Sequence, residues 1–297
     1  IPLLKQWYQR RVHGERDAAC ETDTASQPAG DGGMMCARVP TGPLLCAAGP
    51  LLRLKPSLWP LRLSFASQQR KRSTVTMSAY TVEHVVLFSV RGDVDPSKIH
   101  SMVSNLNALA SLDPVLHLTS GPIHRNRSPS FRFTHLLHSR YKTKEDLSAY
   151  SLHPDHLSVV RQFVLPICDD IMAVDWIGQG VDGAAVVPRP GSALRFQFLK
   201  VKEGLGDAEK GQIVEAVKGI RGVCGTIDQI SVGDNFSPER AKGFSLASVA
   251  IFPSLEELEG LNAKEEAVKL HKDKVRDFIE TVIVLDYALP TAQPASL

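Results

Sequence analysis

The chain has 297 residues, enough for two ordinary domains, and a formal net charge of +2 at pH 7. Residues 1–78 carry 11 basic and 5 acidic residues, whereas the rest of the chain carries 23 basic and 27 acidic residues. This acidic balance after residue 78 argues against a nucleic-acid partner, because nucleic-acid grooves need clustered cations. The most apolar run, 43–65, is broken by prolines and basic residues, so we expect no membrane span and no membrane partner.

The N-terminal segment has the composition of a targeting sequence. Between Asp31 and Glu83 there is no acidic residue, while seven basic residues occur together with many Ser, Leu and Ala. This pattern is typical of a transit peptide for the chloroplast or the mitochondrion, and a disordered or spurious extension is the alternative. Either interpretation makes residues 1–78 a disordered or targeting segment outside the folded core.

The rest of the chain contains one pattern written twice. The stretch "EHVVLFSV" (83–90) is matched by "ALRFQFLK" (193–200), and "AVDW" (173–176) is matched by "VLDY" (284–287). We align the first strand at an offset of 110 residues and the later strands at 111. A repeat of this length is the size of a whole domain, so it indicates two domains of the same fold. We therefore predict a first domain, a Gly/Pro-rich linker, a second domain and a C-terminal tail, at residues 79–178, 179–191, 192–290 and 291–297.

Each copy reads as strand, helix, two strands, helix and strand. In the first copy, Asp95-Pro96 is a good start for a helix, because Asp caps helices and Pro suits the first turn. His153-Pro154 is a second helix entry of this kind. The expected strands of the first copy lie at 83–90, 115–122, 131–141 and 167–176, and those of the second at 193–200, 226–233, 243–252 and 282–289.

This order predicts an α+β fold of two tandem ferredoxin-like β-α-β-β-α-β domains, each with both helices on one face of an antiparallel sheet. We place Val86, Phe88, Phe133 and Leu137 on the other, helix-free face. An apolar face must be buried, so we expect two sheets to face each other and form a dimeric-type α/β barrel. The partner sheet is either the second domain of the same chain or a second copy in a homodimer.

Three stretches of the sequence resemble a known protein family. "VEHVVLFSV" in the first strand, "HPDH" at the second helix and "AVDW" in the last strand resemble the stress-responsive dimeric A/B-barrel (Dabb) family of plants. The tandem arrangement, with "LPICDDIMAVDW" and "GDNFSPERAKGFS", resembles the two-domain type associated with peroxisomes. The resemblance implies the predicted barrel fold, but it implies no single reaction. It also gives weight to the terminal Ala295-Ser296-Leu297 as a relaxed peroxisomal address.

One enzyme of this family, olivetolic acid cyclase, closes a polyketide chain with histidines and a tyrosine inside its barrel. The resemblance places the corresponding residues at His84, His135, Tyr150 and His156. The family also has a magnesium site made of backbone carbonyls, which the resemblance places near Leu109, Leu112 and Val115. No other cofactor is predicted.

Physical chemistry alone also favours the same four side chains. Histidine transfers protons near neutral pH, and a neighbouring tyrosine can donate a hydrogen bond to an enolate. We expect His84 and His135 to point into the barrel. At the offsets given above, the second copy has apolar residues at all four positions, namely Leu194, Leu246, Leu261 and Ala267. The fold therefore does not require the polar set, which favours a pocket in the first domain.

Two functions follow from these observations. The first is a stress-response protein that binds a small apolar ligand in the barrel cavity of the first domain. The alternative is a cyclase-like lyase on a polyketide or related β-keto compound, with His156 as the base, Tyr150 as the acid, and His84 and His135 shaping the pocket.

Overall fold

The computed structural model describes residues 80–179 and 187–291. The predicted segment 1–78, most of the predicted linker and the terminal Ala295-Ser296-Leu297 lie outside the described residues. Among the described residues, no helix is long and apolar enough to cross a membrane.

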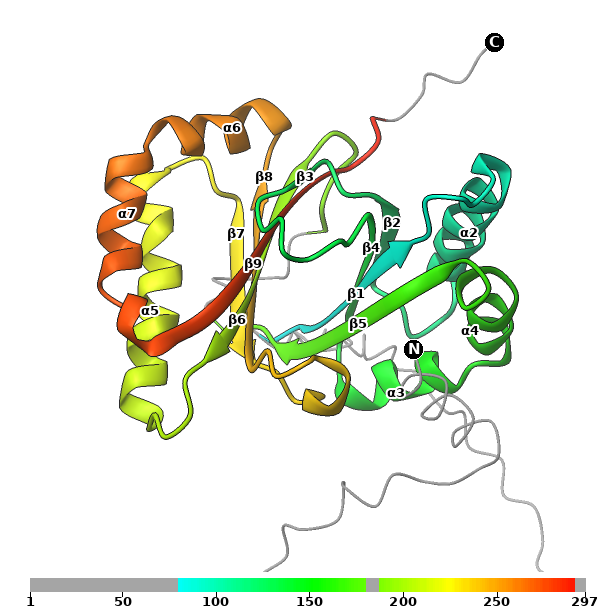
Figure 1. The fold of residues 1–297 in the computed structure, drawn as a ribbon, viewed down its shortest axis with the longest axis horizontal. Helices are drawn as coiled ribbons and strands as arrows, with labels where there is room; N and C mark the ends of the chain where they lie inside the picture. The colour runs from blue at the N-terminus through cyan, green and yellow to red at the C-terminus, as the bar shows by residue number, and fades with distance from the viewer. Residues whose placement is uncertain (1–79, 180–186, 292–297) are drawn as a thin grey trace, which may run out of the picture. The chain divides into compact units, whose positions relative to one another are not determined.

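The first domain contains a four-stranded antiparallel sheet in the order β2-β4-β1-β5. This is the ferredoxin-like order expected from the sequence. Helices α2 and α4 lie against one face of this sheet (Figure 1). The elements are β1 Val82–Val90, α2 Pro96–Ala108, η2 Leu109–Ser111, β2 His117–Pro122, β4 His135–Tyr141, α3 Lys144–Leu152, α4 Pro154–Val159, η3 Val160–Val164 and β5 Cys168–Ile177.

The second domain repeats this arrangement, with its helices again against one face of the sheet (Figure 1). Its sheet has the order β9-β6-β8-β7, and a short strand of the first domain, β3 (Arg125–Asn126), adds to β9. The sequence did not predict β3. The elements are β6 Ala193–Val201, α5 Asp207–Val223, β7 Gln229–Asp234, η4 Pro238–Arg240, β8 Leu246–Phe252, α6 Leu255–Ala263, α7 Glu265–Asp273, η5 Arg276–Phe278 and β9 Ile279–Ala288.

The helix-free faces of the two sheets pack on each other. One buried cluster joins side chains of both sheets, including Leu87, Met172 and Trp176 from the first and Phe196 and Val249 from the second. The strand edges meet through β3 and through isolated bridges, Trp176 with Asn235 and Gln179 with Val232. In the described part of the chain these edge contacts are short: β3 pairs with β9 over two residues, and single bridges join the other edge. The two sheets therefore face each other as the α/β barrel prediction requires, but they do not close into a complete barrel.

The structure corrects the predicted faces of the first sheet. Val86, Phe88 and Leu137 pack in the core beneath the helices, and only Phe133 belongs to the cluster between the sheets. Both faces of this sheet are apolar, so alternation along a strand separates the two faces without saying which one meets the helices.

The strand register also corrects the internal alignment. His84 pairs with Asp175 across β1 and β5, and Arg195 pairs with Asp286 across β6 and β9. The offset is therefore 111 residues in the first strand as well, and the counterpart of His84 is Arg195 rather than Leu194. A shift of one residue moves a side chain to the opposite face of a strand, which is why the error matters.

Local sequence explains the break between α3 and α4. His153 ends α3 and is also the N-cap of α4, where its Nδ1 accepts a hydrogen bond from the Asp155 backbone N–H at 3.2 Å. Pro154 occupies the first turn of α4, as the helix-entry interpretation predicted. This break places Tyr150 at the end of one helix and His156 at the start of the next.

Candidate functional site

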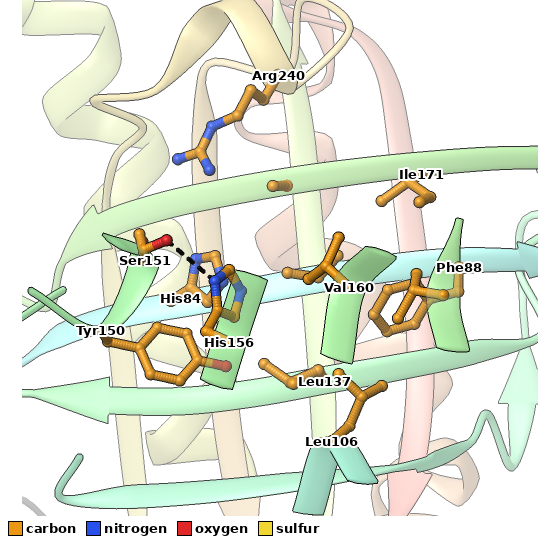
Figure 2. Close-up of a pocket in the computed structure, with 13 residues that line it drawn as sticks. His84, Phe88, Leu106, Leu137, Tyr150, Ser151, His156, Val160, Ile171 and Arg240 are labelled. Carbon is orange, nitrogen blue, oxygen red and sulfur yellow. Dashed lines mark hydrogen bonds between the residues drawn. The ribbon is translucent and has the colours of Figure 1, made fainter. Parts of the chain in front are cut away.

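A pocket of about 60 Å³ lies between the first sheet and the helices of its own domain. Figure 2 shows two ends: His84, Tyr150, Ser151 and His156 gather at one end, and aliphatic and aromatic side chains occupy the other. The full lining is His84, Val86, Phe88, Leu106, Leu137, Tyr150, Ser151, His156, Val160, Val164, Ile171, Ala173 and Arg240. The predicted cavity was inside the barrel, but that space is occupied by the packed cluster between the sheets.

His84 is held in place by a buried carboxylate. Its Nδ1 lies 2.5 Å from Oδ1 of Asp175 on the neighbouring strand β5. Because an ionised carboxylate only accepts hydrogen bonds, Nδ1 is the donor, and Nε2 is the ring nitrogen left for other partners. Asp175 therefore fixes the orientation of His84 and the tautomer of its neutral form.

Asp175 is bound from the other domain as well. Ser237 Oγ donates to Oδ2 of Asp175 at 2.5 Å, and Arg240 binds the same oxygen. Burial alone would raise the pKa of Asp175, but the Arg240 guanidinium and His84 together hold it well below its usual range. The carboxylate is therefore ionised, and the loop after β7 brings Arg240 of the second domain to the first domain's pocket (Figure 2).

Tyr150 and His156 face each other across the break between α3 and α4. Their ring centroids are 4.6 Å apart, and the Tyr150 ring is 6.3 Å from that of His84. Burial raises the pKa of Tyr150 well above its usual value, so its hydroxyl stays protonated near neutral pH. Tyr150 shares a side-chain hydrogen bond with Tyr141, and in this protonated form its hydroxyl can donate a hydrogen bond but cannot act as a base.

His156, in contrast to Tyr150, can accept a proton. Its Nδ1 donates to the backbone carbonyl of Ser151 at 3.0 Å (Figure 2). Burial, reinforced by the charge of His84, lowers the pKa of His156 to about 4. The ring is thus neutral at pH 7, with Nδ1 protonated and Nε2 left as a proton acceptor.

The four predicted site residues do not all meet. His84, Tyr150 and His156 line one pocket, on the helix side of the sheet rather than inside the barrel. His135 shares that face, because it pairs with Phe88 across the sheet, but it is not among the residues that line the pocket. Its Nδ1 lies 2.9 Å from the hydroxyl of Thr134 instead.

The segment predicted to bind magnesium forms the end of the first helix. The carbonyls of Leu109 and Leu112 each accept a backbone hydrogen bond, from the N–H groups of Leu112 and Val115. Magnesium usually takes one or two carboxylates together with water. Over residues 80–179 and 187–291 no group of three or more His, Cys, Asp or Glu side chains is arranged to hold a metal. Magnesium at Leu109, Leu112 and Val115 stays a prediction.

Two residues of the site were missed in the sequence. Asp175 lies within "AVDW", which we used only to align the repeats, although a carboxylate in an otherwise apolar strand is itself a signal of a buried partner. Arg240 lies 65 residues away in the second domain and gives no such signal. Only the packing of the two domains brings it to the pocket.

A second polar cluster lies between the sheets, apart from the pocket. Glu83 accepts hydrogen bonds from His138 Nε2 at 2.7 Å and from Arg140 at 2.8 and 3.0 Å. Arg140 also donates to Gln229 of the second domain at 2.9 Å. Burial opposes ionisation of Glu83, but Arg140 and His138 outweigh it and lower its pKa to about 2. The cluster is buried and links the two domains through the hydrogen bond between Arg140 and Gln229.

Comparison with known proteins agrees with the fold and the repeat. The profile of the Stress responsive A/B Barrel Domain matches residues 82–177 and again residues 194–289. A stress-response A/B barrel domain-containing protein of Arabidopsis thaliana is 47% identical over 265 residues, covering 89% of this chain and 99% of that protein. A second Arabidopsis thaliana protein of the same description is 46% identical over 214 residues, covering 71% of this chain and 98% of that protein.

Among solved structures, a proposed monooxygenase from Fusobacterium nucleatum has a TM-score of 0.52 and 13% identity, covering 72% of this chain and 94% of its own. At that identity the likeness concerns the fold alone. The family profile and the Arabidopsis relatives, in contrast, match over most of the chain. This chain therefore belongs to the stress-responsive A/B barrel family and carries two copies of its domain.

Proposed function

We propose that the first domain binds a small, mainly apolar molecule that carries one hydrogen-bonding oxygen. The supporting observation is the pairing of a neutral acceptor, His156 Nε2, with a protonated donor, Tyr150, at one end of an apolar pocket. A phenol or a ketone would place its oxygen at this end and its apolar part against Phe88, Val160 and Ile171 (Figure 2).

The volume limits the ligand. A cavity of about 60 Å³ is smaller than the roughly 150 Å³ that holds benzene in an engineered protein core. A ring can therefore enter only if rim side chains move. Val160 is half-buried and Phe88 is buried, while Arg240 is held by Asp175, so we expect the movement at Val160.

The test is binding of phenol, followed by NMR and compared with toluene as a ligand of similar shape without the hydroxyl. We expect phenol to shift the resonances of Tyr150 and His156 and toluene to bind more weakly. His156→Ala should weaken phenol binding about tenfold, since a charge-free hydrogen bond and its desolvation are worth roughly 1.4 kcal/mol. His135→Ala is the matched control, because His135 shares the sheet face but not the pocket. Equal loss in both variants would contradict the proposal.

A specific observation also favours a second candidate, proton transfer next to a carbonyl. The His84–Asp175 pair, the neutral His156 and the protonated Tyr150 lie around one pocket. In this reaction the C–H bond breaks, its proton passes to Nε2 of His156, and the electron pair forms an enolate. Tyr150 then donates a hydrogen bond to the enolate oxygen. This is the first step of an aldol-type ring closure.

Hydrogen–deuterium exchange at the central carbon of acetylacetone, measured in D₂O, tests this step without knowledge of the natural substrate. We expect the protein to accelerate the exchange, and His156→Ala to remove most of the acceleration while His135→Ala retains it. The rate should fall as the pH decreases through about 4, where His156 becomes protonated. Binding of phenol without any accelerated exchange would leave the binding function and exclude this second candidate.

A further inference from the structure

We propose that the second domain carries its own ligand site, a larger pocket that binds an amphipathic carboxylate with an aliphatic tail. This pocket has a volume of about 750 Å³ and lies between the second sheet and helices α5 and α7. Its volume falls within the roughly 300–1,000 Å³ of typical small-molecule sites. The proposal does not depend on the function of the first pocket.

The two pockets occupy equivalent places in the two copies of the fold. Of the twelve first-domain residues that line the first pocket, eleven have their counterpart, 111 positions later, in the lining of the second. Each pocket also receives one arginine from the opposite domain: Arg240 of the second domain lines the first pocket, and Arg127 of the first domain lines the second. Arg127 Nε donates to Asp286, the counterpart of Asp175, at 2.8 Å.

Smaller side chains at several lining positions contribute to the difference in volume. Tyr150, Phe88 and His156 fill much of the first pocket, whereas the corresponding residues of the second domain are smaller. Val282, which lines the second pocket, is 40% exposed, while its counterpart Ile171 is only 7% exposed. The substitutions from first to second domain are Phe88 to Leu199, Leu137 to Ser248, Tyr150 to Leu261, His156 to Ala267 and Ile171 to Val282.

The walls of the second pocket favour an aliphatic ligand. Its apolar lining consists of Leu, Ile, Val and Ala side chains, and the residues that line it include no phenylalanine, tyrosine or tryptophan. Apart from the His271 imidazole, a flat ring would therefore find little to stack on, whereas a flexible chain can follow the aliphatic walls. Valines of β9 and residues of α5 and α7 supply half of these apolar residues, including Val217, Ile220, Val268, Val282 and Val284.

The rim of the pocket indicates the charge of the ligand. Lys269 and Lys272 on α7 and Arg276 just after it all line the pocket. In the described part of the chain none of these three makes a salt bridge, although Asp273 and Glu280 also line the rim. Glu280 is already paired with Lys200 at 2.7 Å. The remaining excess of cations suits a carboxylate at the mouth and an alkyl chain along the floor.

Isothermal titration of the full chain with decanoate tests the site, with decan-1-ol and decyltrimethylammonium as probes of equal chain length and different charge. We expect one decanoate per chain, weaker binding of the alcohol and no binding of the ammonium compound. Lys269→Glu combined with Lys272→Glu should weaken decanoate binding at least about tenfold. Lys274→Glu is the matched control, since Lys274 is exposed just after α7 but does not line the pocket.

A second variant tests the floor of the pocket without changing charge. Val282→Phe adds volume at an exposed position, so it should block the pocket while leaving the core intact, and we expect at least about a tenfold loss of affinity. Leu152→Phe, at an exposed site of the first domain, should have no effect. Undiminished binding in Val282→Phe, or equal binding of all three probes, would overturn the proposal. Association with anionic phospholipid vesicles in the absence of decanoate binding would overturn it as well, because it would assign the cations to a membrane surface.

Discussion

His156 couples the pocket to the stability of the protein. Its pKa is about 4 in the folded protein, below the ordinary value of 6.5, so protons bind the unfolded chain more tightly. The stability contributed by the neutral ring is fully present above about pH 6.5 and is lost as the pH falls toward 4. We expect the free energy of unfolding, measured with urea between these values, to fall less steeply in His156→Gln than in the unchanged protein. An identical slope would show that His156 is not buried in the neutral form.

Glu83 is the residue on which the cluster between the sheets depends. Glu83→Ala would leave the buried Arg140 guanidinium without its carboxylate partner, and removal of one member of a buried ion pair costs about 3–5 kcal/mol. We expect the free energy of unfolding, measured with urea, to fall by this amount. Lys200→Ala is the control, because the exposed Lys200–Glu280 pair should contribute less than about 1 kcal/mol. Similar losses in the two variants would contradict the assigned role of Glu83.

The junction of β5 and β7 depends on glycine. A Cβ atom at Gly233 would lie 2.3 Å from the backbone oxygen of Ile177, so the two strands would have to separate. We expect Gly233→Ala to destabilise the protein by about 2 kcal/mol and to lower its melting temperature. Gly211→Ala should act in the opposite direction, because Gly211 lies in the open interior of α5, where alanine stabilises a helix by up to about 1 kcal/mol. Calorimetry of both variants checks the signs, and a neutral Gly233→Ala would contradict the close approach.

The strands and helices were largely predictable, whereas their faces were not. Alternating apolar residues and helix caps such as Asp95 determine element type locally, and the repetition of one pattern confirmed the order. The assignment of Val86 and Phe88 to the helix-free face was wrong, because a sheet covered on both sides has no polar face to orient it. The alignment of His84 with Leu194 was wrong for a related reason, since strands of continuous apolar residues hide a slip of one position.

The candidate site was predictable only in part. His84, Tyr150 and His156 are polar residues inside apolar patterns, and they do line one pocket. Arg240 could not be predicted, because it reaches Asp175 through the packing of one domain on the other. Long-range contacts of this kind leave no periodic signal in a single sequence.

Pairing of the two domains within one chain predicts a monomer. The apolar faces that would drive dimerisation, around Leu87, Trp176 and Phe196, are already buried against each other. We expect the full chain to be monomeric at micromolar concentration in light scattering. A fragment of residues 79–179 would expose its half of this surface, and we expect it to self-associate or to unfold. A monomeric, folded fragment would show that the contact between the sheets is dispensable.

Each domain contributes one arginine to the pocket of the other domain, and this arrangement affects how the two pockets can diverge in evolution. In a symmetric homodimer every substitution occurs in both subunits, so the two pockets stay identical. Fusion into one chain removes this constraint. Arg240 and Arg127 still bind Asp175 and Asp286 of the other domain. The two pockets beside these ion pairs nevertheless differ more than tenfold in volume. Each half can therefore acquire its own chemistry while its neighbour keeps the shared framework folded.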